Sequence, residues 1–270
     1  MSFMRLLPGT ELRISALGLG TVKIGRNEQV KYPDAFSIPD DSAVRTLLAQ
    51  ARELGINVLD TAPAYGTSEE RLGQLMEKRQ DWVIVTKTGE EFSNGASHFD
   101  FSAAHTHMSV ERSLRRLRTD YLDLVLIHSD GNDDVLLQQG DCVAALQDCK
   151  RRGLVRAIGM STKTLDGALR AVRELDVVML TYNLQQRAEQ PAIALARELR
   201  KGVFVKKGLM SGHVRQDGRD LVRDSFALVL GEPGVHSLIA GTINPAHLAD
   251  NVRLAKEVID NATGFRPSPE

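Results

Sequence analysis

Residues 57–69 of the 270-residue chain read NVLDTAPAYGTSE. The run Val58–Asp60 is short, apolar and β-branched, which is typical of a buried strand. From Ser68 onward, apolar residues recur at three- and four-residue steps, which indicates an amphipathic helix. A buried strand that ends in a polar residue and leads through a loop into such a helix is the repeating unit of α/β folds.

The rest of the chain repeats this unit, so that eight strands and eight helices are predicted in alternation. The predicted strands are Leu17–Gly20, Val58–Asp60, Val83–Lys87, Leu122–His128, Val155–Met160, Val177–Thr181, Val203–Lys206 and Ser237–Ala240. The predicted helices are Ser42–Leu54, Ser68–Glu77, Thr106–Leu117, Val143–Arg152, Leu165–Glu174, Pro191–Leu199, Leu221–Leu230 and Pro245–Ile259. Eight such units close naturally into a (β/α)8 TIM barrel, which is the predicted fold.

Ahead of the first unit, residues 4–15 read MRLLPGTELRIS, with two strand-like runs around the turn signal Pro8-Gly9-Thr10. This pattern predicts an N-terminal β-hairpin that plugs one end of the barrel. A barrel of this kind commonly needs about 250 residues in one piece, so we predict a single domain over residues 1–270.

The charge and the hydropathy of the chain restrict its partners. A formal net charge of -1 gives no global attraction to nucleic acid or to an anionic membrane, so the ligand is predicted to be a small molecule. The chain has no apolar run of the roughly 20 residues that a membrane span requires, and its start lacks the order of a signal peptide. We therefore expect a cytoplasmic protein; its oligomeric state stays open.

Cysteine and histidine usage gives no metal-site signal. Cys142 and Cys149 lie seven residues apart in a helical stretch, about 10 Å along the axis, which is too far for a disulfide. We predict two free thiols on one buried face. His98, His105 and His107 lie in a loop that leads into a helix, and we interpret them as loop and helix residues rather than as a metal cluster.

Reactive side chains lie where this fold places its chemistry. Barrel enzymes use the C-terminal ends of the strands and the loops that follow them. Asp60 ends the second predicted strand, Lys87 the third and His128 the fourth, while Tyr65 lies five residues beyond Asp60. These four side chains can face one another across adjacent strands.

Together the four side chains have the chemistry needed to reduce a carbonyl group. Hydride transfer to a carbonyl builds negative charge on its oxygen, so a positioned acid must deliver a proton. Tyr65 can be that acid if the ammonium of Lys87 lowers the phenol pKa, with Asp60 as the counter-charge of Lys87. His128 can hydrogen-bond the substrate oxygen or relay its proton.

Each of these residues taken alone also has a structural interpretation. Asp60 can be a turn or helix-capping residue, Lys87 a solvated lysine, His128 a structural histidine and Tyr65 a loop residue. Their order at successive strand ends favours the catalytic interpretation. A barrel hydrolase that uses carboxylates and His128 is a further alternative, but it leaves Tyr65 and Lys87 without a task.

Several motifs, taken together, resemble the aldo-keto reductases. They are residues 57–66 (NVLDTAPAYG) with Ser68-Glu69, Val85–Gly89 (VTKTG), Ser113-Leu114, residues 121–128 (YLDLVLIH), Arg156–Gly159, and Gly241-Thr242 through Asn251. The likeness covers nearly the whole chain. It implies a (β/α)8 barrel that binds an extended nicotinamide cofactor without a Rossmann domain, and a catalytic tetrad of Asp60, Tyr65, Lys87 and His128. It also implies reversible reduction of aldehydes or ketones to alcohols with NADPH, with NADH possible.

The resemblance leaves a second functional alternative open. Some members of the family are nucleotide-binding regulatory subunits, such as certain potassium-channel β-subunits, that have the barrel but little turnover. This chain shows no added docking domain in its sequence.

The resemblance also implies a set of cofactor contacts. They are Gly20, Thr21, Asp60, Ser161, Thr162, Lys206, Lys207, Leu209, Ser211, Gly212, Gly241, Thr242, Asn244, His247, Asp250 and Asn251. Three positions depart from the family pattern around the nicotinamide. Thr162 replaces a common Asn, Met179 replaces a common Gln, and Lys206 stands where many relatives stack an aromatic ring.

The remaining predicted contacts concern the pyrophosphate and the 2′-phosphate of the cofactor. Lys206 and Lys207 end a strand where they can contact the pyrophosphate, and Ser211-Gly212 allows close backbone approach. The segment from Gly241 to His247 lacks the Lys and Arg that pair with the 2′-phosphate in NADP-specific relatives. Thr242, Asn244 and the following helix N-terminus are the remaining candidates for that phosphate. We therefore expect weak discrimination between NADPH and NADH.

The sequence does not name the substrate. Its cavity is predicted to be walled by the loops Ile24–Asp41, Gly89–Ala104 and Ser129–Asp141. The only tryptophan, Trp82, precedes the third strand, so no aromatic wall is predicted from it.

Overall fold

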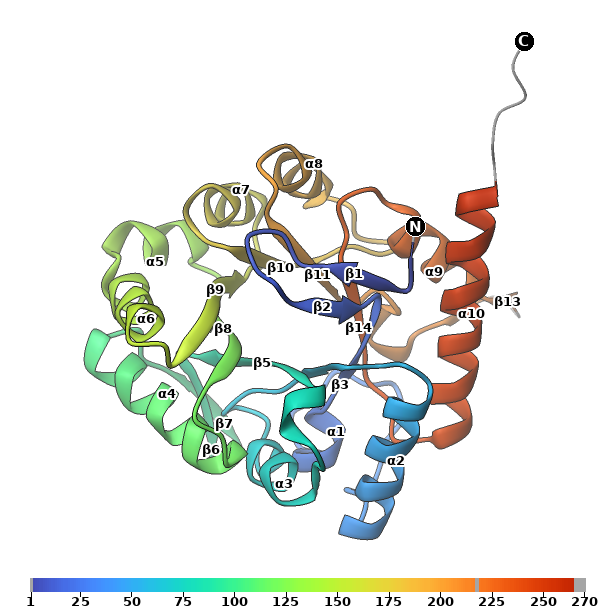
Figure 1. Ribbon diagram of the computed structural model, residues 1–270, viewed down its shortest axis with the longest axis horizontal. Helices are drawn as coiled ribbons and strands as arrows, with labels where there is room; N and C mark the ends of the chain where they lie inside the picture. Colours follow the sequence, from blue (N-terminus) through green and yellow to red (C-terminus); the bar gives the residue numbers. More distant parts are fainter. Residues whose placement is uncertain (1, 217–218, 265–270) are drawn as a thin grey trace.

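Eight parallel strands close into a barrel in the computed structural model of the protein, which describes residues 2–216 and 219–264 (Figure 1). In order around the barrel they are β3 (Leu17–Gly20), β4 (Val58–Asp60), β5 (Val83–Thr88), β8 (Leu122–His128), β9 (Val155–Ser161), β10 (Val177–Thr181), β11 (Gly202–Lys206) and β14 (Ser237–Ala240). The strand β14 pairs with β3 and completes the circle. The predicted (β/α)8 barrel is confirmed, and every predicted strand is found within one residue at each end.

Helices surround the barrel (Figure 1). They are α2 (Asp41–Glu53), α3 (Ser68–Leu75), α4 (Ala103–Leu117), α6 (Asp141–Arg151), α7 (Leu165–Glu174), α8 (Gln190–Glu198), α9 (Val222–Gly231) and α10 (Pro245–Gly264). Their apolar faces and the outer faces of the strands form one large core. Two short helices, α1 (Val22–Gly25) and α5 (Asp133–Gln139), and two 3-10 turns, Arg79–Asp81 and Met210–Gly212, were not predicted.

The predicted N-terminal hairpin is present. Strands β1 (Met4–Leu6) and β2 (Arg13–Ser15) pair antiparallel. The fully buried side chains of Leu7 and Ile14 pack with residues of the barrel interior such as Val58 and Val85. The hairpin therefore plugs the barrel, as the turn signal predicted.

Two further hairpins interrupt segments that the sequence pattern left as loops. Strands β6 (Glu90–Ser93) and β7 (Ala96–Phe99) pair antiparallel directly after β5, and β12 (Arg215–Gln216) pairs with β13 (Arg219–Asp220) after β11. The prediction of an irregular loop over Gly89–Ala104 was therefore wrong in part. Both strands of this first hairpin are short and at most half-buried, so they lack the apolar alternation that marks a strand in a sequence.

The two cysteines are buried in α6 and free, as their spacing predicted. Among the helices described within residues 2–216 and 219–264, none is long and apolar enough to cross a membrane.

Candidate active site

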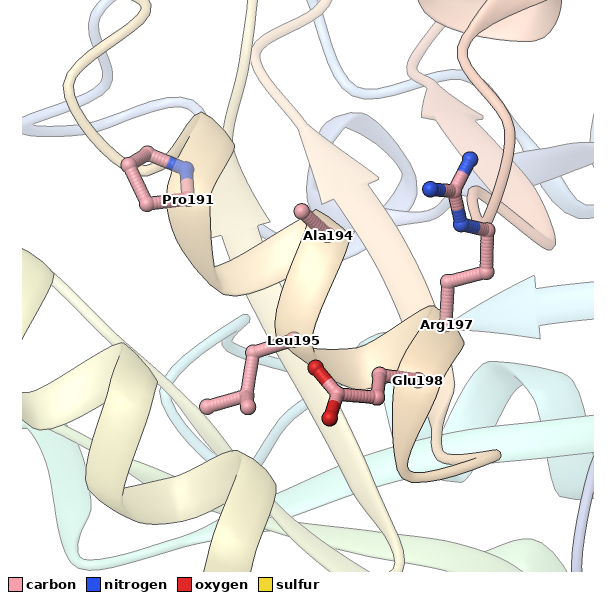
Figure 2. A pocket seen from close by; sticks show the side chains of 5 residues that line it. All are labelled: Pro191, Ala194, Leu195, Arg197 and Glu198. Atoms are coloured by element: carbon pink, nitrogen blue, oxygen red, sulfur yellow. The ribbon is translucent and has the colours of Figure 1, made fainter.

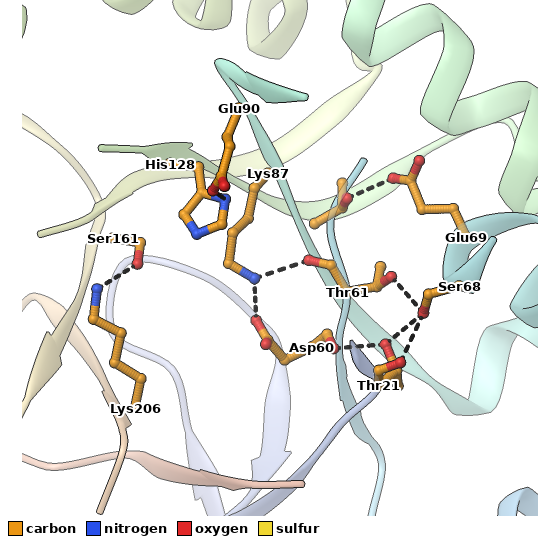
Figure 3. Close-up of polar contacts among 11 residues, drawn as sticks. Thr21, Asp60, Thr61, Ser68, Glu69, Lys87, Glu90, His128, Ser161 and Lys206 are labelled. Atoms are coloured by element: carbon orange, nitrogen blue, oxygen red, sulfur yellow. Dashed lines mark hydrogen bonds and ion pairs between the residues drawn. The ribbon is translucent and has the colours of Figure 1, made fainter. Parts of the chain in front are cut away.

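Three polar side chains meet at the carboxyl ends of three neighbouring strands (Figure 3). Asp60 ends β4, Lys87 lies near the end of β5, and His128 ends β8. These strands pair directly with one another, β4 with β5 and β5 with β8. The parallel register therefore brings the predicted residues together at one mouth of the barrel.

Asp60 and Lys87 form a buried ion pair. The Lys87 Nζ atom donates to Oδ1 of Asp60 at 2.6 Å and to the carbonyl oxygen of Thr61 at 2.8 Å. Only 2% of Lys87 and 5% of Asp60 is exposed. Because neither charge reaches much water, each depends on the other for its stability.

The backbone behind this pair is fixed by hydroxyl groups. Thr21 donates from both its backbone N–H and its Oγ1 to the carbonyl oxygen of Asp60, at 2.9 and 2.8 Å. The Oγ atom of Ser68 donates to Thr21 Oγ1 at 2.8 Å. The hydroxyl of Thr21, a predicted cofactor contact, is thus engaged inside the protein.

Tyr65 is positioned by an unusually close approach of two loops. A Cβ atom added to Gly25 would lie 2.3 Å from the carbonyl oxygen of Tyr65, and one added to Gly66 would lie 2.1 Å from the carbonyl oxygen of Gly25. Gly66 also has a φ of +61°, which favours glycine. Glycine at both positions lets the segments after β3 and β4 touch, which fixes the backbone of Tyr65.

The Tyr65 ring faces Lys87 and His128. Its centroid lies 4.7 Å from the Nζ atom of Lys87 and 6.2 Å from the His128 ring, edge to face. Burial raises the pKa of the Tyr65 phenol well above its ordinary value, and the carboxylates of Asp60 and Glu90 raise it further. The predicted lowering of this pKa by Lys87 is not found in the free protein, because burial and the two carboxylates shift the pKa upward. The phenol is therefore fully protonated at neutral pH.

His128 has a carboxylate neighbour that the sequence reasoning missed. The Nδ1 atom of His128 lies 2.8 Å from Oε2 of Glu90, which is the first residue of β6. Burial lowers the pKa of His128; the Glu90 carboxylate opposes this shift, and the ammonium groups of Lys87 and Lys206 add to it. The signal that could have found Glu90 is its place directly after Gly89, the glycine that follows the third barrel strand.

Lys206 points into the barrel mouth from β11 (Figure 3). Its Nζ atom donates to Oγ of Ser161 at 2.8 Å and to the carbonyl oxygen of Thr162 at 2.6 Å. Burial and, to a smaller extent, the ammonium of Lys207 lower the pKa of the Lys206 ammonium to about 7. The predicted cofactor residues Ser161 and Lys206 thus face the same space.

The side chains of Thr162 and Met179 do not offer polar groups to that space. The Oγ1 atom of Thr162 donates to Oε2 of Glu189 at 2.7 Å, and Thr162 is fully buried. Met179 packs in the apolar interior of the barrel. The structure therefore leaves Ser161 and Lys206 as the polar groups from the predicted set on this side of the mouth.

The segment after β11 has a strained backbone. Lys207, Met210 and Ser211 have φ values of +56°, +49° and +56°, and Gly212 has +95°. Left-handed residues of this kind cluster where a backbone is shaped for a ligand, and successive N–H groups in such turns can face an anion. Leu209 lies within this turn and packs against the core.

The last predicted cofactor residues gather at the start of α10, beside the end of β3. Gly241 follows β14, and its backbone lies against Gly20. The Oδ1 atom of Asn244 accepts hydrogen bonds from the backbone N–H groups of Ala246 and His247, and the Asn244 N–H donates to Thr242 Oγ1. Asn244 thus caps α10, because its side-chain oxygen already accepts hydrogen bonds from two of the backbone N–H groups at the helix N-terminus. His247 and Asp250 are exposed and Asn251 is half-buried on the first turns of α10.

The predicted wall Ile24–Asp41 lies over the same region. Tyr32 packs under the Nζ atom of Lys23, 3.9 Å from its ring centroid. A Cβ atom added to Gly241 would lie 2.9 Å from the Tyr32 hydroxyl, and one added to Gly212 would lie 3.2 Å from Pro33. The loop after β3 therefore reaches across to the turns that follow β11 and β14.

Within the part of the chain that the structure describes, neither a surface hollow on α8 nor a metal-binding group offers a better candidate site. A surface hollow is lined by mostly exposed side chains of α8, from Pro191 to Glu198, and includes none of the residues above (Figure 2). Within residues 2–216 and 219–264, no group of three or more His, Cys, Asp or Glu residues is arranged to bind a metal ion. The barrel mouth is therefore the candidate site.

Comparison with known proteins agrees with this arrangement. A model of the aldo/keto reductase family matches residues 16–222. An uncharacterized oxidoreductase of Bacillus subtilis is 27% identical over 93% of this chain and 90% of its own length. An NADH-specific methylglyoxal reductase of Escherichia coli is 29% identical over 77% of this chain and 69% of its own length.

A solved structure is more similar still. A crystal structure from Pseudomonas aeruginosa, assigned to the aldo-keto reductases, is 53% identical and covers 96% of both chains with a TM-score of 0.87. The family match includes all four residues of the cluster formed by Asp60, Tyr65, Lys87 and His128.

Proposed function

The chain belongs to the aldo/keto reductase family, and from this premise we propose that it reduces a small aldehyde or ketone to an alcohol, reversibly, with Tyr65 as the proton donor. The observation that carries the proposal is the cluster at the barrel mouth, in which a protonated phenol lies beside a buried ion pair and a histidine. We further propose that residues 1–270 act as one barrel domain in the cytoplasm.

The residues of the cluster divide the work of proton delivery. The phenol of Tyr65 keeps its proton at neutral pH, so it is available to the oxygen of a bound carbonyl as negative charge develops there. The Nζ atom of Lys87 lies 4.7 Å from the Tyr65 ring centroid and stabilises the phenolate left behind, while Asp60 holds the ammonium group in place. His128 contacts the same oxygen from the neighbouring strand and orients the substrate.

The residues at the mouth fit a nicotinamide dinucleotide, which when bound supplies the hydride. Ser161 and Lys206 would hold the nicotinamide end, because their polar groups face the mouth beside the cluster. The strained turn Lys207–Gly212, with its lysine and its left-handed backbone, would hold the pyrophosphate. Gly20 and Gly241 would let the cofactor lie close to the backbone where β3 and β14 end.

We expect this protein to bind NADPH and NADH with affinities within about tenfold of each other, because the segment from Gly241 to His247 contains no arginine to grip the 2′-phosphate by a bidentate contact. The start of α10 has Asn244 and His247 at the positions in question, and the Asn244 oxygen is engaged in capping. Titration with each reduced nucleotide, followed by nucleotide fluorescence, measures both affinities. A strong preference for NADPH would contradict the expectation, and failure of both to bind below millimolar concentrations would reject the proposed function.

A further inference from the structure

The His128 ring is backed by a carboxylate that is itself fixed. Oε2 of Glu90 lies 2.8 Å from Nδ1 of His128, and Oε1 accepts a hydrogen bond from Ser97 Oγ at 2.6 Å. Only 14% of the Glu90 side chain and 17% of the His128 side chain is exposed. The Nδ1 atom is buried, and the carboxylate of Glu90 is the charged group paired with it. A carboxylate behind an imidazole fixes the ring orientation and raises its basicity.

A tight turn at Gly89 and the hairpin that follows it place Glu90 beside His128. Gly89 has a φ of +101°, and a Cβ atom there would lie 2.4 Å from the Phe101 ring. Only glycine makes this turn, which carries the chain from the end of β5 into the β6–β7 hairpin. The hairpin then pairs Ser93 with Ala96 and Phe92 with Ser97, which brings Ser97 within reach of Glu90.

The contact decides which ring nitrogen carries a hydrogen. An ionised carboxylate only accepts hydrogen bonds, so a ring nitrogen 2.8 Å away must be protonated. In the neutral ring the Nε2 atom then has no hydrogen. Figure 3 shows this second nitrogen on the side of the His128 ring away from Glu90.

We propose that Glu90 is a positioning residue that orients the His128 ring through Nδ1 and keeps a hydrogen on that nitrogen, so that Nε2 is the atom that gains and loses a proton on the substrate side. This inference rests on the proposed function for the role of His128 in turnover. The ring geometry itself does not depend on it.

The titratable groups that face His128 come from three other strands and one loop. They are Glu90 from β6, Lys87 from β5, Lys206 from β11 and the uncharged phenol of Tyr65. Burial and the two ammonium groups lower the pKa of His128, and Glu90 is the negative group that opposes them. Removing that negative charge lowers the pKa further, so the imidazolium is lost at a lower pH.

The test compares Glu90→Gln with the parent protein by nuclear magnetic resonance of ¹⁵N-labelled histidine. The His128 signal is assigned as the one that disappears in His128→Gln. In the parent, we expect hydrogen on Nδ1 and none on Nε2. In Glu90→Gln, we expect the His128 pKa to fall by about one unit and the Nε2–H tautomer to appear, because a neutral amide can also donate to Nδ1.

Two further variants make the result specific. Glu91→Gln removes the neighbouring carboxylate, which pairs with Arg112 rather than with His128, and should leave the His128 signal as in the parent. Glu90→Asp retains the charge on a shorter side chain and should give an intermediate His128 pKa, and it serves as the test if Glu90→Gln does not fold. An unchanged tautomer and pKa of His128 in the Glu90 variants would overturn the inference.

Turnover separates this inference from the proposed function. We expect Glu90→Gln to lower kcat for carbonyl reduction by about 10- to 100-fold, the usual loss when the carboxylate behind a functional histidine is removed. If the His128 signal changes as expected but the parent protein reduces no carbonyl, the proposed function fails while the role of Glu90 in holding the ring stands. If the parent reduces carbonyls and the Glu90 variants match it in both readouts, only the inference fails.

Discussion

Replacing Tyr65 with Phe should lower the rate of carbonyl reduction by about 10²- to 10⁴-fold, the usual contribution of a positioned general acid. The ring would keep its place beside Lys87, because only the hydroxyl is lost and the tight Gly25–Gly66 contact still fixes the backbone. Steady-state kinetics with a saturating aldehyde measures kcat, and nucleotide fluorescence measures whether binding is retained. Turnover by Tyr65→Phe at the parent rate would show that the proton comes from another group.

Tyr182→Phe is the matched control for Tyr65→Phe. Tyr182 is also a buried tyrosine on the loop that follows a barrel strand, but its hydroxyl donates to Glu232 at 3.2 Å and lies outside the cluster. The variant Tyr182→Phe loses the same hydroxyl oxygen as Tyr65→Phe, from the same residue type. We expect its kcat to match that of the parent.

Replacing Lys87 with Met should destabilise the protein by about 3–5 kcal/mol and also remove most of its turnover, because it leaves the Asp60 carboxylate buried without a counter-charge. The side chains of Lys87 and Asp60 are 1% and 7% exposed, so water cannot take the place of the ammonium. The carbonyl oxygen of Thr61 loses its donor as well. Urea unfolding at pH 7 measures the change in the free energy of unfolding.

Two comparisons test the physical reason for this loss. The double variant Asp60→Asn with Lys87→Met has no uncompensated charge and should recover most of the stability but none of the turnover. Lys150→Met removes a lysine whose Nζ also lies 2.6 Å from a carboxylate, that of Asp176, but at an exposed site. It should cost at most about 1 kcal/mol. Equal losses for Lys87→Met and Lys150→Met would contradict the account of a buried pair.

The barrel could be predicted because its signals are local. Each strand is a short buried run flanked by turns, and each helix has its own apolar stripe, so β4, β8 and β14 were predicted with both ends correct. Asp60, Lys87 and His128 were found for the same reason, since the end of a parallel strand fixes the end of the barrel where a side chain lies.

The contacts that give each residue its properties could not be predicted in the same way. Thr162 is engaged by Glu189, which lies 27 residues later, and His128 is backed by Glu90 from a hairpin with no apolar pattern. The raised pKa of Tyr65 depends on burial and on the carboxylates of Asp60 and Glu90. These depend on pairings between distant segments, which hydrophobic periodicity does not encode.

The central claim is that this barrel transfers a hydride from a nicotinamide to a carbonyl carbon. The most direct test incubates the protein with a reduced nucleotide that has deuterium at both positions of C4, together with a small aldehyde, and analyses the alcohol by mass spectrometry and nuclear magnetic resonance. We predict one deuterium on the former carbonyl carbon of the alcohol. Alcohol without deuterium at that carbon, or tight nucleotide binding with no alcohol from any aldehyde or ketone offered, would contradict the claim; the second result would favour a nucleotide-binding regulatory protein.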